Sequence, residues 1–355
     1  MFKTKIGTDQ TEAYLRGETA QGMFLDFKLV TDTSRVKLPF GIVQVGRCFR
    51  NEIAPRDFMF RCREFHIGEF EFFIHPKMQN CDIITDEQLK LEIPLLSAEM
   101  QDKNKDELVM TSIGDMIKKK KLDGWHGYWL AEQVRWFISL GLKMDNLKIR
   151  EHTKTELSHY SSATFDIDYK YPFGSKELAG NANRGQYDLN QHVKESGKDL
   201  SVFDEESKEK VIPRVIEPTF GMERAFLAVL CDAYEYDKTR DNIVLHLHPK
   251  LAPIKVAVFP LVNKLEDKAR EVFLMLKDEF PCTYDRSGSV GRRYARMDEI
   301  GTPFCVTIDF DSLEKKDVTI RNRDTTEQKR IKITELKDTL RRLVSGEIAF
   351  KGIKN

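Results

Sequence analysis

The sequence has no long apolar run, and this absence limits the kind of protein it encodes. None of its 355 residues belongs to an apolar stretch long enough to suggest a bilayer span. The first residues, Met1 to Lys5, lack the apolar core of a signal peptide. We therefore expect a cytoplasmic protein without a membrane partner.

Clustered cysteines are also missing. The 6 cysteines are scattered, and none forms a Cys-x-x-Cys pair, so the spacing typical of a zinc site is absent. Free, mostly buried thiols in a reducing compartment are the expected state. The six residues are Cys48, Cys62, Cys81, Cys231, Cys282 and Cys305.

The formal net charge is zero, because 57 Lys and Arg residues balance 57 Asp and Glu residues. A protein that only coats nucleic acid is usually basic. The neutral balance favours an enzyme that holds RNA over part of its surface and a small anionic ligand in a pocket. Hydrophobic residues at 41% and charged residues at 32% make an ordinary globular composition.

The chain is long enough for two domains, and its hydrophobic pattern changes near His248. Before this point, β-rich runs at 39–49 and 61–73 predict a long antiparallel hairpin. We expect a mixed α+β domain with a largely antiparallel sheet over residues 1–247. Its other expected elements are a largely helical region at 87–150, strands at 165–169, 176–182 and 187–189, a surface loop at 194–210 and a helix at 225–234.

After His248, strand patterns alternate with helix patterns, which predicts a small α/β domain with a mixed sheet over residues 248–355. The expected strands are 255–261, 282–284, 304–310 and 316–321, and the expected helices are 264–277, 290–300 and 332–344.

The hairpin carries the residue types of a nucleotide site. Phe49-Arg50-Asn51-Glu52 and Phe60-Arg61-Cys62-Arg63-Glu64-Phe65 each place Arg and Glu beside Phe. Arg guanidinium groups bind phosphate oxygens in pairs, a carboxylate can read the adenine amino group, and an aromatic ring offers a stacking face. Composition alone leaves open a charged surface hairpin with cross-strand Arg–Glu pairs.

The longer pattern from Gly46 to Phe65 resembles motif 2 of the class II aminoacyl-tRNA synthetases, in the form found in glycyl-tRNA synthetases. Residues 16–22 resemble the family's R-P-E-T-A-Q-G segment, with Gly17 in place of proline. Residues 176–189, 217–224 (motif 3) and 286–301 (the anticodon-binding domain) also resemble this family, in the same order along the chain. The resemblance implies a class II antiparallel-sheet catalytic domain, followed by an α/β anticodon-binding domain with a mixed five-stranded sheet.

The resemblance also implies ATP as a substrate, with Arg50 and Arg224 as the catalytic residues. Arg50 would hold the α-phosphate, and Arg224 would cover adenine or the γ-phosphate. Glu177 is the implied Mg²⁺ contact, since this ion takes few carboxylates and keeps waters and phosphates. The implied ATP-binding residues are Arg50, Asn51, Glu52, Phe60, Arg61, Arg63, Phe65, Glu177, Leu178, Gly221 and Arg224.

Glycine is the amino acid that the resemblance implies. Carboxylates packed around a small amine would bind its ammonium, and surrounding bulk would exclude alanine. A structural salt bridge is the alternative for each glutamate taken alone. The implied glycine-binding residues are Glu18, Phe65, Glu69, Glu217, Thr219 and Gly221.

The implied macromolecular partner is tRNA(Gly), gripped through phosphates by arginines of the C-terminal domain. Nearby acidic residues, including Asp285 and Asp298, leave an intramolecular network equally open. His152, His159 and Tyr160 are expected to be structural residues. The candidate tRNA-binding residues are Arg292, Arg293, Arg296, Arg321 and Arg323.

One departure from the family concerns motif 1, a long helix and strand that precede the glutamate segment represented here by Glu18. The chain begins almost at this residue, so we expect a catalytic domain incomplete at its N-terminal side. It would work as a homodimer or with a separate N-terminal chain, or the sequence is a fragment. Two other hypotheses are less favoured. The retained arginines and glutamates argue against a non-catalytic, synthetase-like RNA-binding protein, and the segments at 18–21 and 291–296 argue against a class II synthetase for threonine, proline or histidine.

Overall fold

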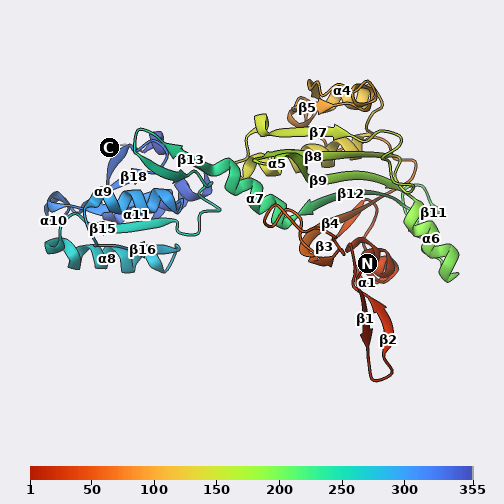
Figure 1. Ribbon diagram of the computed structural model, residues 1–355, viewed down its shortest axis with the longest axis horizontal. Coiled ribbons are helices and arrows are strands. Elements are labelled where there is room, and N and C mark those ends of the chain that lie inside the picture. The colour runs from red at the N-terminus through yellow and green to blue at the C-terminus, as the bar shows by residue number, and fades with distance from the viewer. Residues whose placement is uncertain (354–355) are drawn as a thin grey trace. The chain divides into compact units, whose positions relative to one another are not determined.

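The computed structural model describes residues 1–353, which fall into two compact units (Figure 1). The first unit comprises Met1–Ser139 and Lys143–Ala228, and the second comprises Leu140–Leu142 and the chain from Val229 onward. The division lies within helix α7, Met222–Ala233, ahead of the change of pattern near His248. It does so because the hairpin of β13 (Tyr234–Asp237) and β14 (Asn242–Leu245) packs on helix α9 (Val290–Glu299) of the second unit.

The first unit is built on an eight-stranded sheet with the order β3-β4-β12-β9-β8-β7-β5-β6. All neighbouring pairs are antiparallel except β5 and β7, so the expected α+β domain with a largely antiparallel sheet is confirmed. The strands are β3 (Phe40–Phe49), β4 (Glu64–Ile74), β12 (Arg214–Gly221), β9 (Gly174–Gly185), β8 (Ala163–Tyr171), β7 (Leu147–Glu151), β5 (Glu92–Leu96) and β6 (Val109–Ser112).

The predicted long hairpin is formed by β3 and β4. Their antiparallel pairing runs without a break from Phe40 opposite Phe73 to Phe49 opposite Glu64. In the connecting loop, Arg56 and Arg61 form an isolated bridge. This pairing brings the Phe49 and Phe65 ends of the two motif segments together.

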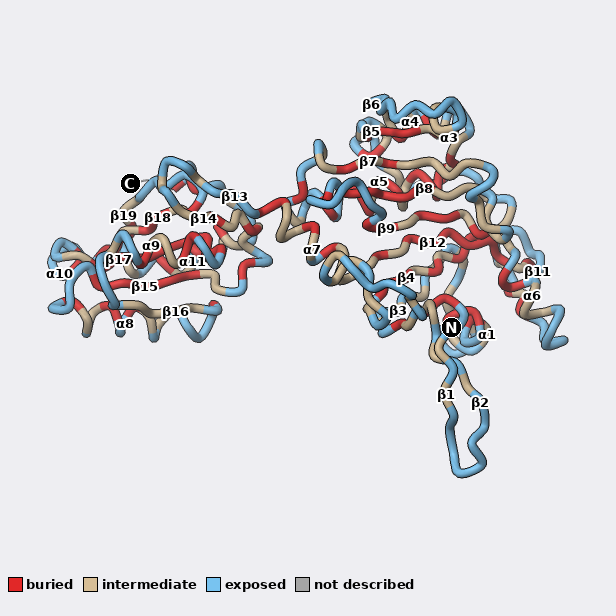
Figure 2. Tube along the Cα trace, in the orientation of Figure 1, coloured by how far each residue is buried: buried red, intermediate tan, exposed pale blue. Residues whose placement is uncertain are grey.

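The central strands of the sheet are largely buried (Figure 2), and helices pack on both of its faces. On one face, α5 (Gly124–Ser139) packs Trp125 against Ile74 and Ile216. On the other face, Phe24 and Phe27 of α1 (Ala20–Ser34) pack on Phe73, together with Leu189 of α6 (Tyr187–Ser196). The two helical layers leave part of the second face free for a cavity.

The region 87–150 is less helical than its pattern predicts, and this prediction was partly wrong. Pro94 lies inside strand β5, where Ile93, Leu95 and Leu96 around it are buried in the sheet. The prediction of a strand at 187–189 was also wrong, since these residues begin α6. The elements of 86–151 are α2 (Asp86–Leu89), β5, α3 (Ala98–Asp102), β6, α4 (Ile113–Lys118), α5, η1 (Met144–Asn146) and β7.

Two small hairpins extend the first unit. The hairpin of β1 (Lys3–Ile6) and β2 (Thr11–Tyr14) projects from it and is largely exposed (Figures 1 and 2). The prediction of a surface loop at 194–210 was partly wrong, since the segment begins inside α6 and buries Leu200 and Val202 in the core beside α1. The second hairpin, β10 (Val202–Asp204) and β11 (Glu209–Val211), starts within it.

The second unit is an α/β domain with a five-stranded sheet, order β16-β15-β17-β18-β19. β15 pairs in parallel with β16 and β17, and the remaining pairs are antiparallel, so the expected mixed sheet is confirmed. Its strands are β15 (Val256–Pro260), β16 (Cys282–Tyr284), β17 (Phe304–Ile308), β18 (Asp317–Asn322) and β19 (Gln328–Lys332). Its helices are η2 (Asn263–Leu265), α8 (Glu266–Lys277), α9, α10 (Phe310–Lys315), α11 (Ile333–Ser345) and η3 (Phe350–Gly352).

Across residues 1–353, no helix combines the length and the apolar character that a membrane crossing requires.

Candidate active site

A cavity lies in the first unit, on the sheet face opposite α5. Side chains alternate between the two faces of a strand. Since Ile216 and Phe220 of β12 pack on α5, the alternate residues Glu217 and Thr219 face the cavity. The strand residues that line it are Phe65, His66, Ile67 and Glu69 of β4, Thr164 of β8, Glu177, Leu178, Ala179, Gly180, Asn181, Ala182 and Arg184 of β9, and Glu217, Thr219 and Gly221 of β12.

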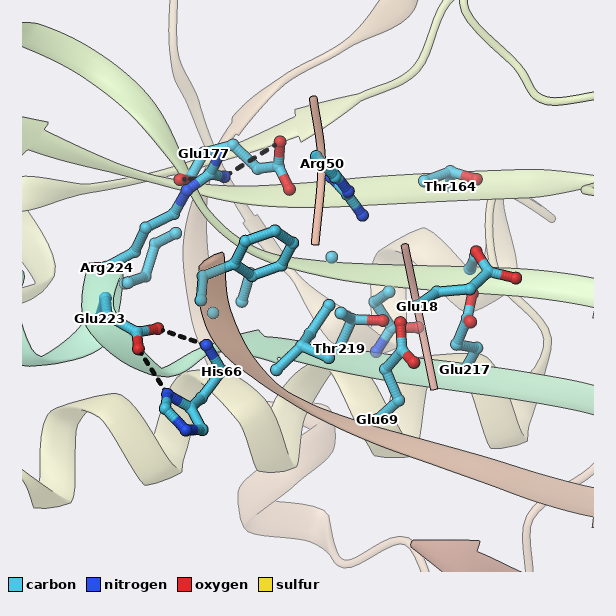
Figure 3. Close-up of a pocket in the computed structure, with 18 of the residues that line it drawn as sticks. Glu18, Arg50, His66, Glu69, Thr164, Glu177, Glu217, Thr219, Glu223 and Arg224 are labelled. Atoms are coloured by element: carbon cyan, nitrogen blue, oxygen red, sulfur yellow. Dashed lines mark hydrogen bonds and ion pairs between the residues drawn. The ribbon is translucent and has the colours of Figure 1, made fainter. Parts of the chain in front are cut away.

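The cavity has two chemically different ends (Figure 3). Glu18, Glu69 and Glu217 are grouped at one end, and Arg224 lies beside Glu177 at the other. The carboxylate end suits a small cation, and the arginine end suits a polyanion.

Arg224 is fixed at the start of α7 by contacts with Phe60 and Glu177. Its guanidinium lies 4.5 Å from the centroid of the Phe60 ring. Nη1 donates to the backbone oxygen of Glu177 at 3.0 Å and forms an ion pair with its carboxylate at 3.3 Å. The flat guanidinium and the aromatic ring offer stacking surfaces for a nucleobase.

Glu52 organises the loop between β3 and β4. Its Oε2 accepts from Nε and Nη2 of Arg61 at 2.8 and 2.7 Å, and its backbone oxygen accepts from Nε of Arg63 at 2.9 Å. Arg61 keeps 43% of its side chain exposed, so its guanidinium remains accessible to a phosphate.

Arg50 lies between the two ends of the cavity (Figure 3). Its Nε donates to the backbone oxygen of Gly17 at 3.2 Å, and its guanidinium carbon lies 5.2 Å from the centroid of the Phe65 ring. These contacts hold the plane of the guanidinium while its terminal nitrogens stay accessible. A guanidinium held in this way is suited to a phosphate and a carboxylate that meet at one point.

Glu69 caps the N-terminus of α1 from inside the cavity. It is only 4% exposed, and its Oε2 accepts from the backbone nitrogens of Thr19 at 2.6 Å and Ala20 at 2.9 Å, and from the Thr19 hydroxyl at 2.5 Å. The positive end of the helix dipole stabilises a negative charge at this position. Oε1 is left for a ligand.

Glu217 is held by a buried arginine. Nη1 of Arg184 donates to Glu217 Oε1 at 2.6 Å, while its Nε and Nη2 donate to the two carboxylate oxygens of Asp188 at 2.8 and 2.9 Å. The Tyr160 ring stacks on this guanidinium, with its centroid 4.2 Å from the central carbon. Burial raises the pKa of Glu217 to about 7; Arg184 opposes this shift and Glu69 adds to it.

Most residues that the resemblance assigns to ATP and glycine are brought together by the fold. Asn51 and Arg63 do not line the cavity; Asn51 is exposed, and Arg63 acts through Glu52. The assigned residues that line it are Glu18, Arg50, Glu52, Phe60, Arg61, Phe65, Glu69, Glu177, Leu178, Glu217, Thr219, Gly221 and Arg224.

The structure adds residues that the sequence interpretation did not assign. His66 and Glu223 line the cavity and bind each other, with Glu223 accepting from the backbone nitrogen of His66 at 2.9 Å and lying 2.7 Å from its Nδ1 (Figure 3). Tyr160 and His152 also line it, although both were expected to be structural. Arg184 belongs to a recognised segment, but nothing in its spacing indicates that it holds Glu217.

A magnesium ion is compatible with one carboxylate of this site. Within residues 1–353, no group of three or more His, Cys, Asp and Glu side chains is placed to hold a metal ion. Mg²⁺ commonly binds through one or two carboxylates together with substrate phosphates and waters. Glu177 meets this need, since its carboxylate is 52% exposed and lines the cavity.

Burial in the second unit makes three of the candidate tRNA-binding arginines unavailable to RNA. Arg293, Arg321 and Arg323 are buried, at 3%, 6% and 2% exposure, and bond internal partners such as Pro260 and Asp298. A guanidinium committed to buried acceptors is not available to an RNA phosphate. Arg292 is exposed, and Arg296 is 43% exposed and paired with Asp285.

The sheet with its β3–β4 hairpin and β12–α7 junction, joined to a mixed α/β domain, has the architecture of a class II aminoacyl-tRNA synthetase. The family model described as anticodon binding domain matches residues 255–343. Proteins named glycine–tRNA ligase are 47% identical to 95% of this chain in Caldanaerobacter subterraneus, 46% identical to 95% in Ruminiclostridium cellulolyticum and 42% identical to 100% in Borrelia hermsii.

The chain belongs to the glycine–tRNA ligase family. It spans 65% of the length of the first two of these relatives and 72% of the third.

Proposed function

We propose that this chain activates glycine with ATP and transfers it to the 3′ end of tRNA(Gly). The observation that carries the proposal is the single cavity with carboxylates at one end and arginines at the other. Glycine's ammonium would bind among Glu18, Glu69 and Glu217, and the phosphates of ATP would bind Arg50 and Arg61 with their neighbours. The names of the relatives support the same reaction.

In the first step, a carboxylate oxygen of glycine attacks the α-phosphorus of ATP, and the bond from this phosphorus to the bridging oxygen breaks. Pyrophosphate leaves and glycyl-adenylate remains. Arg50, between the two ends, holds the attacking carboxylate and the α-phosphate together and offsets the charge that grows there. Positioning and electrostatic stabilisation carry such a reaction without a protein nucleophile.

In the second step, a terminal ribose hydroxyl of tRNA attacks the carbonyl of the adenylate. The new ester forms as the bond to the phosphate oxygen breaks and AMP leaves. The anticodon-binding domain would hold the other end of the tRNA, with Arg292 and Arg296 as its phosphate contacts. A cytoplasmic location fits this role in protein synthesis.

When bound, Mg²⁺ would neutralise phosphate charge. Glu177 is the carboxylate that would hold it, and the ion pair with Arg224 at 3.3 Å keeps this carboxylate oriented.

We further propose that the working enzyme is an assembly of two copies, or of this chain with a polypeptide that supplies the rest of the relatives' length. Support comes from exposed apolar side chains on neighbouring elements, Leu25 and Leu29 of α1 and Val43 and Val45 of β3. β3 is also an edge strand, and exposed apolar edges favour pairing with another chain.

A non-catalytic RNA-binding role is the alternative, and the cavity argues against it. A protein without the reaction has no need to keep Arg50, Glu69 and Arg224 around one cavity.

The test of the proposed function is glycine-dependent exchange of pyrophosphate into ATP. We expect exchange with glycine and about 5- to 150-fold less with alanine, because forcing a methyl group into a packed pocket costs about 1–3 kcal/mol. The assay compares the chain alone with the chain mixed with a polypeptide carrying the remainder of a relative. Lack of exchange in both samples would refute the proposal.

The pKa of Glu217 predicts a pH-dependent KM for glycine. As pH falls below about 7, Glu217 takes up a proton and loses its attraction for the ammonium, which stays charged throughout. KM for glycine should rise by up to about tenfold per pH unit, the limit for one proton linked to binding. It is measured from exchange rates at saturating ATP. Glu217→Gln should show a raised KM without this dependence, and a flat wild-type profile would contradict the assignment.

A further inference from the structure

Glu71 lies two positions after Glu69 on β4, so both side chains belong to the same face of the strand. Its side chain is 0% exposed, and among residues 1–353 no hydrogen-bond donor reaches either carboxylate oxygen. An ionised carboxylate kept dry and unpaired is strongly unfavourable. Glu71 therefore needs either a positive partner or a proton.

The strand register shows which side chain lies opposite Glu71. In the pairing of β4 with β12, Thr219 is opposite Glu69 and Ile216 is opposite Phe72. The same register places Glu217 opposite Glu71. Side chains directly opposite each other in antiparallel strands have Cβ atoms about 5 Å apart, so two buried carboxyl groups are neighbours.

Among the described residues 1–353, no cation is free to pair with the Glu71 carboxylate. Arg184 of β9 is the cation that acts on it, and this guanidinium is already bonded to Glu217 and to Asp188 of α6. The other groups acting on it are acidic, namely Glu69 on its own strand, Glu217 and Asp188. On the remaining side, β3 places Ile42 opposite Glu71, which offers no charge.

We propose that Glu71 is a neutral carboxylic acid that shares its proton with Glu217 and so positions Glu217 for the ammonium of glycine. The positioning role rests on the proposed function. Burial raises the pKa of Glu71 well above its usual range, and repulsion from Glu217 adds to the shift. The two carboxyl groups then lose their protons as a coupled pair, with Glu71 keeping the more tightly held proton.

The shared proton explains how Glu217 can serve several partners. A carboxylate has about four acceptor positions on its two oxygens. Glu217 can therefore accept from Arg184 and from the Glu71 hydroxyl and still present a lone pair to an ammonium in the cavity. Without Glu71, one of the contacts that fix the orientation of Glu217 is lost.

The proton on Glu71 can be measured without any activity. In the unfolded chain a glutamate has a pKa of about 4.3, so near neutral pH Glu71 is ionised there and protonated in the folded chain. Stability must then fall as pH rises. Relative to Glu71→Gln, which carries no titrating proton, the wild-type unfolding constant should rise about tenfold per pH unit between about pH 6 and 8.

Urea unfolding followed by tryptophan fluorescence gives this constant for the first unit alone. All 3 tryptophans, Trp125, Trp129 and Trp136, lie on α5 of this unit. Glu87→Gln is the matched control, because the Glu87 side chain is 80% exposed; its ratio to wild type should not change with pH. A Glu71→Gln ratio that also stays constant would overturn the proposal, since Glu71 would then be ionised in the folded chain.

The positioning role is tested by KM for glycine in the exchange assay. Glu71→Gln keeps a donor for Glu217 and should stay within about threefold of wild type, whereas Glu71→Leu should raise KM about tenfold or more, the usual effect of losing a hydrogen bond to a charged group. Equal KM values in Glu71→Leu and wild type would overturn the positioning role. If the wild type shows no exchange, the proposed function fails. The change of the unfolding constant with pH still decides whether Glu71 holds its proton.

Discussion

Arg50→Ala should lower glycine-dependent pyrophosphate exchange by at least about a hundredfold, the usual loss when one preorganised donor is removed from a developing charge. The guanidinium of Arg50 lies between the carboxylate end and the arginine end of the cavity (Figure 3), held by Gly17 and by the Phe65 ring. In the proposed reaction, this guanidinium can contact both the carboxylate of glycine and the α-phosphate of ATP. Its removal should affect kcat more than KM for glycine, because the ammonium contacts remain.

Arg47→Ala is the matched control for this substitution. Arg47 lies on β3, shortly before Arg50 in the sequence, is 57% exposed and pairs with Glu64 at 3.0 Å, and it does not line the cavity. It should exchange at nearly the wild-type rate. Unfolding curves of both variants should match the wild type, because Arg50 is exposed and surface contacts contribute little to stability. Near-normal exchange by Arg50→Ala would mean that the α-phosphate binds elsewhere.

Arg184→Met should lower the free energy of unfolding of the first unit by about 3–5 kcal/mol, the typical result of breaking a buried ion pair from one side. Arg184 is 3% exposed and is bonded to Glu217 and Asp188. Methionine fills a similar volume beside Tyr160 but leaves both carboxylates without their cation. Urea unfolding followed by tryptophan fluorescence measures the loss.

Arg135→Met provides the comparison on the surface. Its side chain is 41% exposed and pairs with Glu132 at 2.9 Å, so the loss should stay below about 1 kcal/mol. A double variant, Arg184→Met with Glu217→Gln, should recover part of the stability lost by Arg184→Met, because one uncompensated charge is gone. If Arg184→Met is no more damaging than Arg135→Met, Arg184 does not hold the carboxylates together.

Local sequence predicted the β3–β4 hairpin well. The β-rich runs on either side of a loop with Pro55 carry alternating residues, and β3 and β4 pair over their full length. The elements of the second unit were predicted equally well from the sequence, since strands such as β15 and helices such as α8 and α11 carry clear apolar periodicity. Each of these elements buries one continuous face, and such a pattern is visible in a short window of residues.

The structure of the region 87–150 was harder to predict from the sequence, because its short strands do not show such a continuous pattern. β5 and β6 are short, and β5 lies between α2 and α3 in the sequence, so charged segments and short apolar runs gave a helical appearance. At 187–189, two apolar residues near strand β9 suggested another strand, but Leu189 packs into the core beside α1 as part of α6. Short apolar runs do not distinguish strand from helix until their packing partners are known.

The sequence by itself determined the family, the order of the motifs and the residue types at the cavity, because these depend on residue identity and spacing. The tertiary structure alone decided which charges act on each other. Glu69 caps α1 from a strand 49 residues away in sequence, Arg184 joins Glu217 to Asp188, and Glu71 faces Glu217 without a cation. The same folding withdrew Arg293, Arg321 and Arg323 from the surface. Burial and pairing set the charge state and accessibility of an ionisable group, and both arise only when distant segments pack together.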